Sequence, residues 1–524
     1  MNSHSQRAPG GSAAPVRESM IWFSPALVLL TIAVLDSSRY ADPDLYGHLR
    51  FGQQILLTGH APRVDPYSYS ITGLAWVSHE WLSDVIIAWL YSHGGAAGLK
   101  LLKLGCSAGL VVTLLFAMEE TGASALAQFA ILFVAAVRLS AQMQFRPQIF
   151  TYLLLSVTLL MLARDTFRGH APLWTLPPIF ALWANLHGGF VVGLGAMGLY
   201  ALVSGARAIS THNGAARLVR LCAITAACAM ATLLNPYGTA IWFNVLHTVG
   251  NPAMLEAISE WQPLYRATIT QYHVAHIPFF YDLSLFGIFI GLGVALAAAP
   301  SSADLALSAI AVVLIAAAIA QVRNVPLGMI AAIPPLAYHA TLWFEAHQGG
   351  RARFAPPRRQ SRAGQAAVTV VAFALAAETG LFSPRLVPSE TYPAGALAFM
   401  RSRDLYGNIL CKYSWNDYLI FHEAPKDRVF IDSRFEMVYP SRIINAFFKF
   451  SRAARDAGHT LADFPNDYVL IEPNTSSERV MAGASGWKLI YSDGNSMLYA
   501  PRGSRAAAIA GIPVRGSATI PVFP

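Results

Sequence analysis

Charged residues are scarce in this 524-residue chain: Asp, Glu, Lys and Arg make up 13% of it, about half of the ~25% found in soluble domains. Hydrophobic residues make up 55%, and apolar runs long enough to cross a bilayer recur along most of the sequence. This composition excludes a soluble globular protein. In a membrane protein the net charge of +8 reports orientation and does not indicate nucleic-acid binding.

Cysteine is also rare, with four residues in the chain. Three of them lie in apolar runs, and Cys411 stands alone in the polar C-terminal part. Their spacing matches neither a disulfide framework nor a set of metal ligands. The sequence also lacks internal repeats, a Walker loop, a dinucleotide-binding fingerprint and a zinc motif. These absences remove the usual signatures of nucleotide-dependent and zinc-dependent proteins.

Long hydrophobic runs predict about eleven membrane spans, within a transmembrane domain over residues 20–386. Residues 1–19 form a polar tail before a first run that we interpret as a retained span, since no small-residue cleavage site clearly follows it. The run at 82–92 is too short to cross and predicts an interfacial helix. The predicted spans are 20–36, 97–117, 122–140, 148–163, 172–186, 189–206, 217–235, 279–299, 303–321, 325–343 and 365–383.

Arginine placement orients these spans. Five arginines between residues 350 and 362 place that loop in the cytoplasm. Alternation then puts the N-terminus inside and the C-terminal part outside. One inner loop fits poorly, because Glu119 and Glu120 lie there without a basic residue.

Two polar clusters follow the first span, in a predicted outer-face loop over residues 37–96. Carboxylates and histidines beside a bilayer are costly and are usually retained for chemistry. An ordinary solvated loop, in which carboxylates cap helices and form turns, is the alternative. The candidate residues are Asp42, Asp44, Tyr46 and His48 in the first cluster, and His79 and Glu80 in the second.

More polar residues fall at the outer ends of later spans. Arg146, His187, Arg323 and Asn324 are the candidates for substrate binding. Each also has a simpler interpretation: the arginines as headgroup anchors, and His187 as a helix end before two glycines. Gathering on one face is typical of a site that opens to the outer leaflet. We therefore expect Asp42 and Asp44 to face an outer-leaflet cavity, with Arg146, His187 or Arg323 within about 10 Å, a distance that a bound sugar phosphate could bridge.

Acidic residues beside arginines at a membrane face suit glycosyl transfer from a lipid-phosphate sugar. The acceptor needs a carboxylate as general base, and the departing phosphate needs a cation to receive its charge. The lipid tail needs an apolar groove between spans. Two other classes remain open: a lipid-linked sugar transporter or flippase, which would carry charges in mid-membrane, and a non-enzymatic protein of envelope polysaccharide assembly.

The stretch from Asp42 through Asp44 and Tyr46 to Arg50, with Gly59 and Pro62 further on, resembles the GT-C membrane glycosyltransferases. Protein mannosyltransferases and lipid A aminoarabinose transferases are the types it is most similar to. The resemblance implies a polyprenyl-phosphate sugar donor, an inverting transfer of a hexosyl or pentosyl group at the periplasmic face, and Asp42 as the base.

Those relatives usually carry adjacent Asp-Glu, whereas Pro43 separates two aspartates here. The Asp-X-Asp arrangement is similar to the metal-linked acidic motifs of oligosaccharyltransferase-like members. A divalent metal such as Mg²⁺ or Mn²⁺ is therefore a candidate cofactor.

Composition changes near residue 387. Short apolar runs predict strands at 408–412, 418–421, 428–432, 468–472, 487–491 and 496–500, with a helix at 443–457. The remainder, residues 503–524, is rich in Ala, Gly and Ser and is typical of a disordered tail. The predicted fold is an all-α polytopic membrane bundle, GT-C-like, with a small extracytoplasmic α/β domain over residues 387–502.

Overall fold

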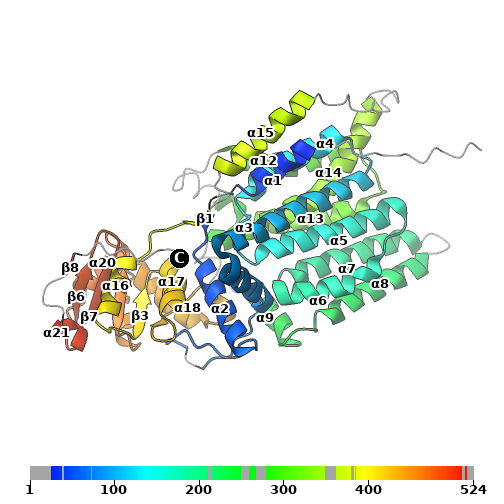
Figure 1. Ribbon diagram of the computed structural model, residues 1–524. Coiled ribbons are helices and arrows are strands. Elements are labelled where there is room, and N and C mark those ends of the chain that lie inside the picture. The colour runs from blue at the N-terminus through cyan, green and yellow to red at the C-terminus, as the bar shows by residue number, and fades with distance from the viewer. Residues whose placement is uncertain are drawn as a thin grey trace, which may run out of the picture.

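The molecule consists of a large helical bundle and a smaller domain that contains a β-sheet (Figure 1). The first-loop helix α2 (Leu45–Thr58) lies between the two parts. This is a computed structural model, and it describes residues 25–37, 40–71, 73–209, 214–249, 259–266, 279–347, 362–378, 383, 385–509 and 514–515. The predicted tail of residues 1–19 and most of the arginine-rich loop lie outside these ranges.

A helix coincides with each of the eleven predicted spans. In chain order the bundle helices are α1 (Pro25–Leu35), α3 (Trp81–Glu120), α4 (Ala125–Ser140), α5 (Gln148–Arg168), α6 (Leu176–Leu186), α7 (Phe190–Ile209), α8 (Gly214–Ala231), α9 (Ala240–Val249), α12 (Phe279–Ala298), α13 (Leu305–Ala320), α14 (Val325–His347) and α15 (Arg362–Glu378).

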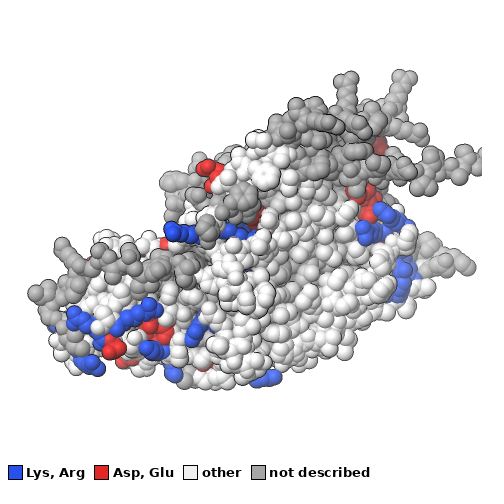
Figure 2. Space-filling view, in the orientation of Figure 1, with Lys and Arg blue, Asp and Glu red and all other residues white. Residues whose placement is uncertain are grey.

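By length and composition, five helical segments among the described residues could cross a membrane, and several shorter apolar helices accompany them. The five are Trp81–Glu120, Gln148–Arg168, Phe190–Arg207, Gly214–Ala231 and Val322–His347. The face of the bundle in view is largely uncharged, whereas charged side chains gather on the C-terminal domain and at the far end of the bundle (Figure 2). This is the surface of a multi-pass membrane protein.

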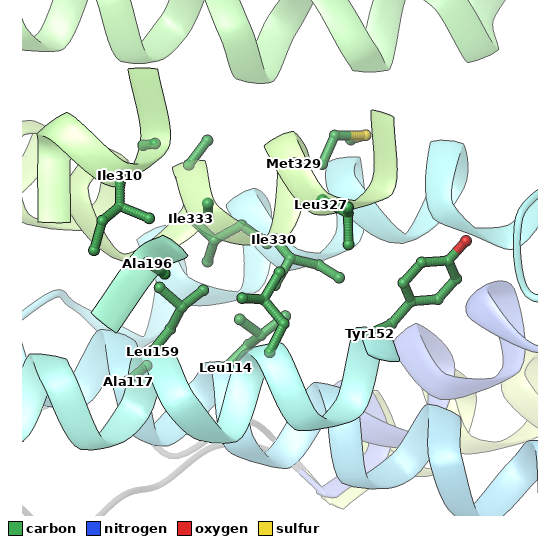
Figure 3. Packing of buried hydrophobic residues seen from close by; sticks show 14 of the residues in the cluster. Leu114, Ala117, Tyr152, Leu159, Ala196, Ile310, Leu327, Met329, Ile330 and Ile333 are labelled. Carbon is green, nitrogen blue, oxygen red and sulfur yellow. The ribbon is translucent and has the colours of Figure 1, made fainter. Parts of the chain in front are cut away.

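Helix α14 lies at the centre of the bundle, where it packs against α3, α4, α5, α12 and α13. Its residues Leu327, Ile330 and Ile333 lie close to Leu114 of α3 and Leu159 of α5 (Figure 3). Lipid tails are as apolar as leucine, so close packing, more than exclusion of water, holds such helices together in a bilayer.

Helix α3 contains the predicted interfacial helix and the second predicted span. The two halves are separated at Gly95, whose φ of 53° interrupts the helix. This left-handed conformation strongly favours glycine. The chain therefore turns at Gly95 from a loop segment into the bundle.

Two acidic residues at the ends of bundle helices have basic partners. Glu120, which fits the charge rule poorly in sequence, pairs with Arg164 and Arg168 of α5. Asp165 is fully buried and binds Arg217 at 2.6 Å and Arg220 at 2.8 Å. The basic partners of both carboxylates therefore come from other helices of the bundle.

The C-terminal domain is built on a six-stranded sheet in the order β4-β3-β5-β7-β6-β8. Strand β3 is parallel to both β4 and β5, and β7 runs antiparallel between β5 and β6. The strands are β3 (Asn408–Cys411), β4 (Arg428–Val429), β5 (Tyr468–Ile471), β6 (Trp487–Ser492), β7 (Met497–Pro501) and β8 (Val514–Arg515). Its helices are α16 (Ala394–Ser402), α17 (Asn416–Glu423), α18 (Ser441–Ser451), α19 (Gly458–Ala462), α20 (Ser476–Gly483) and α21 (Arg505–Ile509).

Two predictions for this domain are wrong in detail. Residues 418–421 were predicted as a strand but lie within α17, because a short apolar run fits a buried helix equally well. Residues 505–509 and 514–515, within the predicted disordered tail, form α21 and β8. Ala506 and Ala507 are buried, so this segment packs onto the sheet despite its low complexity.

The first loop and the C-terminal domain share one hydrophobic core. Tyr46, Phe51, Tyr67 and Trp76 of the loop belong to the same buried cluster as the sheet residues of the domain. Strand β1 (Tyr40–Ala41) pairs in parallel with β2 (Val387–Pro388) and joins the two segments at their bases. The loop after the first span is therefore a structural part of the C-terminal domain.

Candidate active site

Three carboxylates from two distant segments converge on Arg146. The Arg146 guanidinium donates through Nη2 to Asp44 Oδ2 at 2.6 Å and through Nη1 to Glu260 Oε1 at 2.9 Å. Asp42 Oδ2 lies 3.8 Å from Nη1. The distance expected between the two aspartates and Arg146 is confirmed. The outer-leaflet cavity that they were expected to face stays a prediction.

Local backbone geometry directs the two aspartates. Asp42 Oδ1 accepts the Asp44 N–H at 3.0 Å, a side-chain turn typical of aspartate. Asp44 stands at the N-cap of α2, yet its side chain makes no cap hydrogen bond. Its carboxylate binds Arg146 instead of a backbone N–H of the first helical turn, where an N-cap aspartate usually accepts a hydrogen bond.

Burial and charge shift the ionisation of this cluster. Burial raises the pKa of Asp44 to about 7, with a further contribution from Asp42 and an opposing one from Arg146. Burial alone would lower the pKa of Arg146, but Glu260 and the two aspartates hold it well above its ordinary value. Arg146 is therefore a permanent cation among acidic groups.

His48 forms a second polar pair one turn further along α2. Its Nδ1 lies 2.8 Å from Asp84 Oδ1, and both residues are buried. Burial opposes the charged imidazole, but the hydrogen bond to Asp84 and the charges of Glu80 and Asp44 raise the pKa of His48 to about 9. The pair fixes α2 against the start of α3.

Glu80 stands between two histidines. Its Oε1 lies 3.5 Å from His79 Nε2 and 3.4 Å from His187 Nε2. The start of α3 is tied to the end of α6, because Trp81 Nε1 donates to the Asn185 side chain at 2.8 Å. That contact brings Glu80 from the first loop to His187 between two spans.

Hydrogen bonds around His187 specify its tautomer. Trp183 Nε1 donates to Thr151 Oγ1 at 2.8 Å, which leaves the threonine hydroxyl proton for His187 Nδ1, also at 2.8 Å. The Gly189 N–H donates to the same nitrogen at 2.9 Å. Since Nδ1 accepts, we infer that the proton sits on Nε2, which faces Glu80.

Ionisation agrees with this arrangement. Burial lowers the pKa of His187 to about 3, although Glu80 opposes the shift. Burial raises the pKa of Glu80, but His79 and His187 outweigh it, and the net shift is downward. A neutral His187 thus faces an ionised Glu80 at neutral pH.

Arg323 is a second cation close to Glu260. Its guanidinium stacks over the Trp261 ring at 4.0 Å from the ring centre. The Val322 N–H donates to the Gln262 carbonyl at 3.1 Å, which joins the two loops. Arg146 lowers the pKa of Glu260 most, burial opposes this shift, and the charge of Arg323 lowers the pKa further.

Two other predicted residues have structural partners. The Asn324 amide donates to the Ala317 carbonyl at 3.2 Å, at the end of α13. Tyr46 is fully buried, with Tyr392 and Tyr418 rings at 5.1 and 5.2 Å. Tyr46 therefore packs the interface between loop and domain and, in this conformation, does not line the site.

Residues of the C-terminal domain approach the same cluster. Asp417 of α17 lies so close to α2 that a Cβ at Gly47 would stand 2.8 Å from its Oδ1. Burial, then the charges of Asp432 and Asp44, raise the pKa of Asp417 well above its usual range. Asp417 and Tyr413, like Glu260, were absent from the predicted site residues.

The sheet topology explains this approach. Strands β3, β4 and β5 are parallel, and ligand sites of such sheets lie at the carboxyl ends of the strands. Tyr413 and Asp417 follow β3, Asp432 follows β4 and Glu472 follows β5. Since Asp417 Oδ1 would stand 2.8 Å from a Cβ at Gly47 of α2, this edge of the sheet faces the first loop.

The geometry of the acidic cluster differs from that of a metal site. Among the described residues, no group of three His, Cys, Asp or Glu side chains is arranged to hold a metal ion. The Asp-X-Asp carboxylates do not converge on an open position, because the Arg146 guanidinium lies between them and Glu260. This donor set does not fit a divalent cation.

No family model and no curated protein matches the sequence. Among solved structures, the fold is similar to the apo oligosaccharyltransferase of Archaeoglobus fulgidus, with a TM-score of 0.56, 10% identity, and coverage of 87% of this chain and 70% of that chain. It is also similar to the arabinofuranosyltransferase AftD from Mycobacteria, with a TM-score of 0.51 and 14% identity over 91% of this chain and 41% of that one. ArnT from Cupriavidus metallidurans, bound to undecaprenyl phosphate, aligns at a TM-score of 0.47 and 14% identity, over 91% and 97% of the two chains.

The structures that resemble this chain are membrane glycosyltransferases, and at these identities the likeness concerns the fold. The apolar helices and the mixed C-terminal domain agree with it. The chain therefore has the GT-C fold.

Proposed function

We propose that the protein transfers a sugar, with inversion, from a polyprenyl-phosphate donor to an envelope acceptor at the periplasmic face of a bacterial inner membrane. The observation that carries the proposal is the acidic cluster of Asp42, Asp44 and Glu260 around Arg146, with Arg323 beside it. On one side of the reacting carbon, a carboxylate can take the proton of the acceptor. On the other side, a cation can stabilise the charge of the departing phosphate.

Asp42 serves as general base. Its Oδ2 is the carboxylate oxygen of the Asp pair less committed to Arg146, at 3.8 Å against 2.6 Å for Asp44. Asp42 takes the proton of an acceptor hydroxyl or amine as the acceptor atom bonds to the anomeric carbon. The bond from that carbon to the phosphate oxygen breaks, and its electron pair leaves with the polyprenyl phosphate.

Arg323 receives the phosphate charge. Arg146 is surrounded by carboxylates, so a phosphate beside it would meet repulsion from Asp42, Asp44 and Glu260. Arg323 stacks on Trp261 and stands at the end of α13, where a lipid tail could enter between spans. Charge-assisted hydrogen bonds from guanidinium to phosphate are among the stronger polar contacts.

The acceptor enters from the side of the C-terminal domain. Tyr413 and Asp417, at the carboxyl edge of the sheet, stand near enough to Asp44 for its charge to act on their pKa values. Glu80, His79 and His187 supply further hydrogen-bonding groups for the sugar. In this arrangement residues 387–502 form a periplasmic acceptor-side domain, and residues 20–386 bind the lipid-linked donor.

The structural neighbours support the reaction class. An oligosaccharyltransferase and an arabinofuranosyltransferase, by their names, transfer sugars. One oligosaccharyltransferase structure of the same fold carries a tethered acceptor peptide, at a TM-score of 0.54 and 12% identity. These names and the bound acceptor peptide support the proposal that this chain transfers a sugar to a glycan, lipid or protein acceptor.

The test is transfer from a panel of defined polyprenyl-phosphate sugars in proteoliposomes, with isolated envelope fractions as acceptors. Wild type should transfer one of the sugars, and Asp42→Asn should lose about 10²–10⁴-fold in rate, as is typical for a missing general base. Asp463→Asn, which removes an exposed carboxylate of the outer domain, is the matched control. Wild-type rates in Asp42→Asn would reject Asp42 as base, and no transfer from any donor would favour a transporter.

A further inference from the structure

Three carboxylates surround Arg146, as carboxylates surround a metal ion, but the group at their centre is a guanidinium. The carboxylates come from the first loop and from the turn at Glu260, while Arg146 comes from the connection between α4 and α5. Oxygens of aspartate and glutamate at Asp-X-Asp spacing are what Mg²⁺ and Mn²⁺ prefer. Here those oxygens point at a side chain of the protein itself.

The two ends of the guanidinium are both engaged. Nη2 donates to Asp44 at 2.6 Å, and Nη1 donates to Glu260 at 2.9 Å with Asp42 at 3.8 Å. The planar fork of arginine suits carboxylates from different directions, and the group stays charged at any physiological pH. A divalent cation bound to the same oxygens would lie beside this charge and would be repelled by it.

The position of Arg146 is fixed by its neighbours. Pro147 follows it directly and stands at the N-cap of α5, so the backbone is restricted at the point where the helix begins. The Arg146 side chain is only 20% exposed. An arginine held in this way cannot swing out to admit an ion without leaving three carboxylates close together.

We propose that Arg146 is the resident cation of this site, holding Asp42, Asp44 and Glu260 in place of a divalent metal, so that sugar transfer needs no added metal. The inference rests on the proposed function for its catalytic consequence, but the occupancy of the cluster can be measured without transfer. With a single positive charge at its centre, the cluster also keeps an excess of negative charge, which favours a carboxylate that accepts a proton.

The experiment titrates the full-length purified protein with Mn²⁺ and follows bound ion by electron paramagnetic resonance. Wild type should take up no Mn²⁺ at this cluster up to about 1 mM, the weak limit of extracellular oxygen-ligand sites. Arg146→Ala should bind one ion per chain, and Arg146→Ala with Asp44→Asn should lose it. Arg146→Lys, which keeps the charge, should resemble wild type.

A wild-type protein that binds Mn²⁺ tightly, and loses it in Asp44→Asn, would overturn the proposal even if Arg146→Ala fails to fold. Failure of folded Arg146→Ala to gain an ion would overturn it as well. In the transfer assay the wild-type rate should be unchanged by a chelator, and a loss restored by Mg²⁺ or Mn²⁺ would refute the inference. If no donor supports transfer, the proposed function fails, while the Mn²⁺ titration still decides the role of Arg146.

Discussion

Arg434 is a buried cation that joins the C-terminal domain to the first loop, and its removal should separate them. Its Nη2 donates to Asp65 of the loop at 2.6 Å, and its Nε donates to Asp432 at 2.9 Å. Both carboxylates are fully buried. The guanidinium also lies 4.3 Å from the Trp76 ring centre and 5.0 Å from that of Phe51.

The expected cost of Arg434→Met follows from these contacts. Removing one partner of a buried ion pair typically costs about 3–5 kcal/mol, because the other charge stays buried. A desolvated cation–π contact adds about 2 kcal/mol. Methionine refills part of the aromatic pocket, and one freed carboxylate can take up a proton. We therefore expect the free energy of separating or unfolding the domain to fall by about 4 kcal/mol.

Limited proteolysis in detergent measures this change, since cleavage follows the population of the open form when opening is rapid. A loss of about 4 kcal/mol raises that population by roughly a thousandfold, so Arg434→Met should be cut within the 387–502 region far faster than wild type. Arg442→Met, an exposed change on α18, is the control and should alter stability by less than about 0.5 kcal/mol. Equal cleavage of the two variants would refute the reasoning.

Three further predictions address the site and its orientation. Arg323→Ala should raise the donor KM by about ten- to a hundredfold, for a lost charged hydrogen bond of about 1.5–3 kcal/mol, and an unchanged KM in proteoliposome kinetics would remove Arg323 from the phosphate site. Cysteine-accessibility labelling should find residues 350–362 inside and 400–500 outside, because five arginines in a short loop resist translocation; labelling of both from one side would reject the topology. The folded-state pKa of His48, about 9, lies above its ordinary 6.5, so the stability from its pair with Asp84 should be complete below pH 6.5 and lost as pH rises through 9. Unfolding titrations should show this loss in wild type and not in His48→Gln.

The helices of the bundle could be predicted from the sequence because their determinants are local. An apolar run of span length must satisfy its own backbone hydrogen bonds in lipid, so its length and bounds follow from composition alone. The break at Gly95 agrees with the prediction that 82–92 is separate from the span that follows. The charge rule likewise predicts the acidic and basic motifs on one face, and the contact of Arg146 with Asp44 agrees with that prediction.

The shared core of loop and outer domain could not be predicted in the same way. Tyr46 and Tyr418 are 372 residues apart in sequence, yet their rings meet at 5.2 Å. A tyrosine beside two aspartates resembles a substrate contact until its packing partners are known. The approach of Asp417 to Gly47 could not be predicted for a related reason, because it depends on how the two segments dock.

The distribution of charge across the proposed site gives each arginine a separate task. The side that contains Asp42, Asp44, Glu260 and Arg146 carries more carboxylates than cations. Arg323 stacks on Trp261, and its charge also lowers the pKa of Glu260. During an inverting transfer, negative charge leaves the acceptor oxygen and appears on the phosphate oxygen. A negative wall behind the acceptor and a cation behind the phosphate favour that displacement, and the groups are already in place before the substrate binds. A phosphate bound to Arg146 would lie among carboxylates and would be repelled by them. The arginine that holds the acidic cluster therefore differs from the arginine that receives the leaving group.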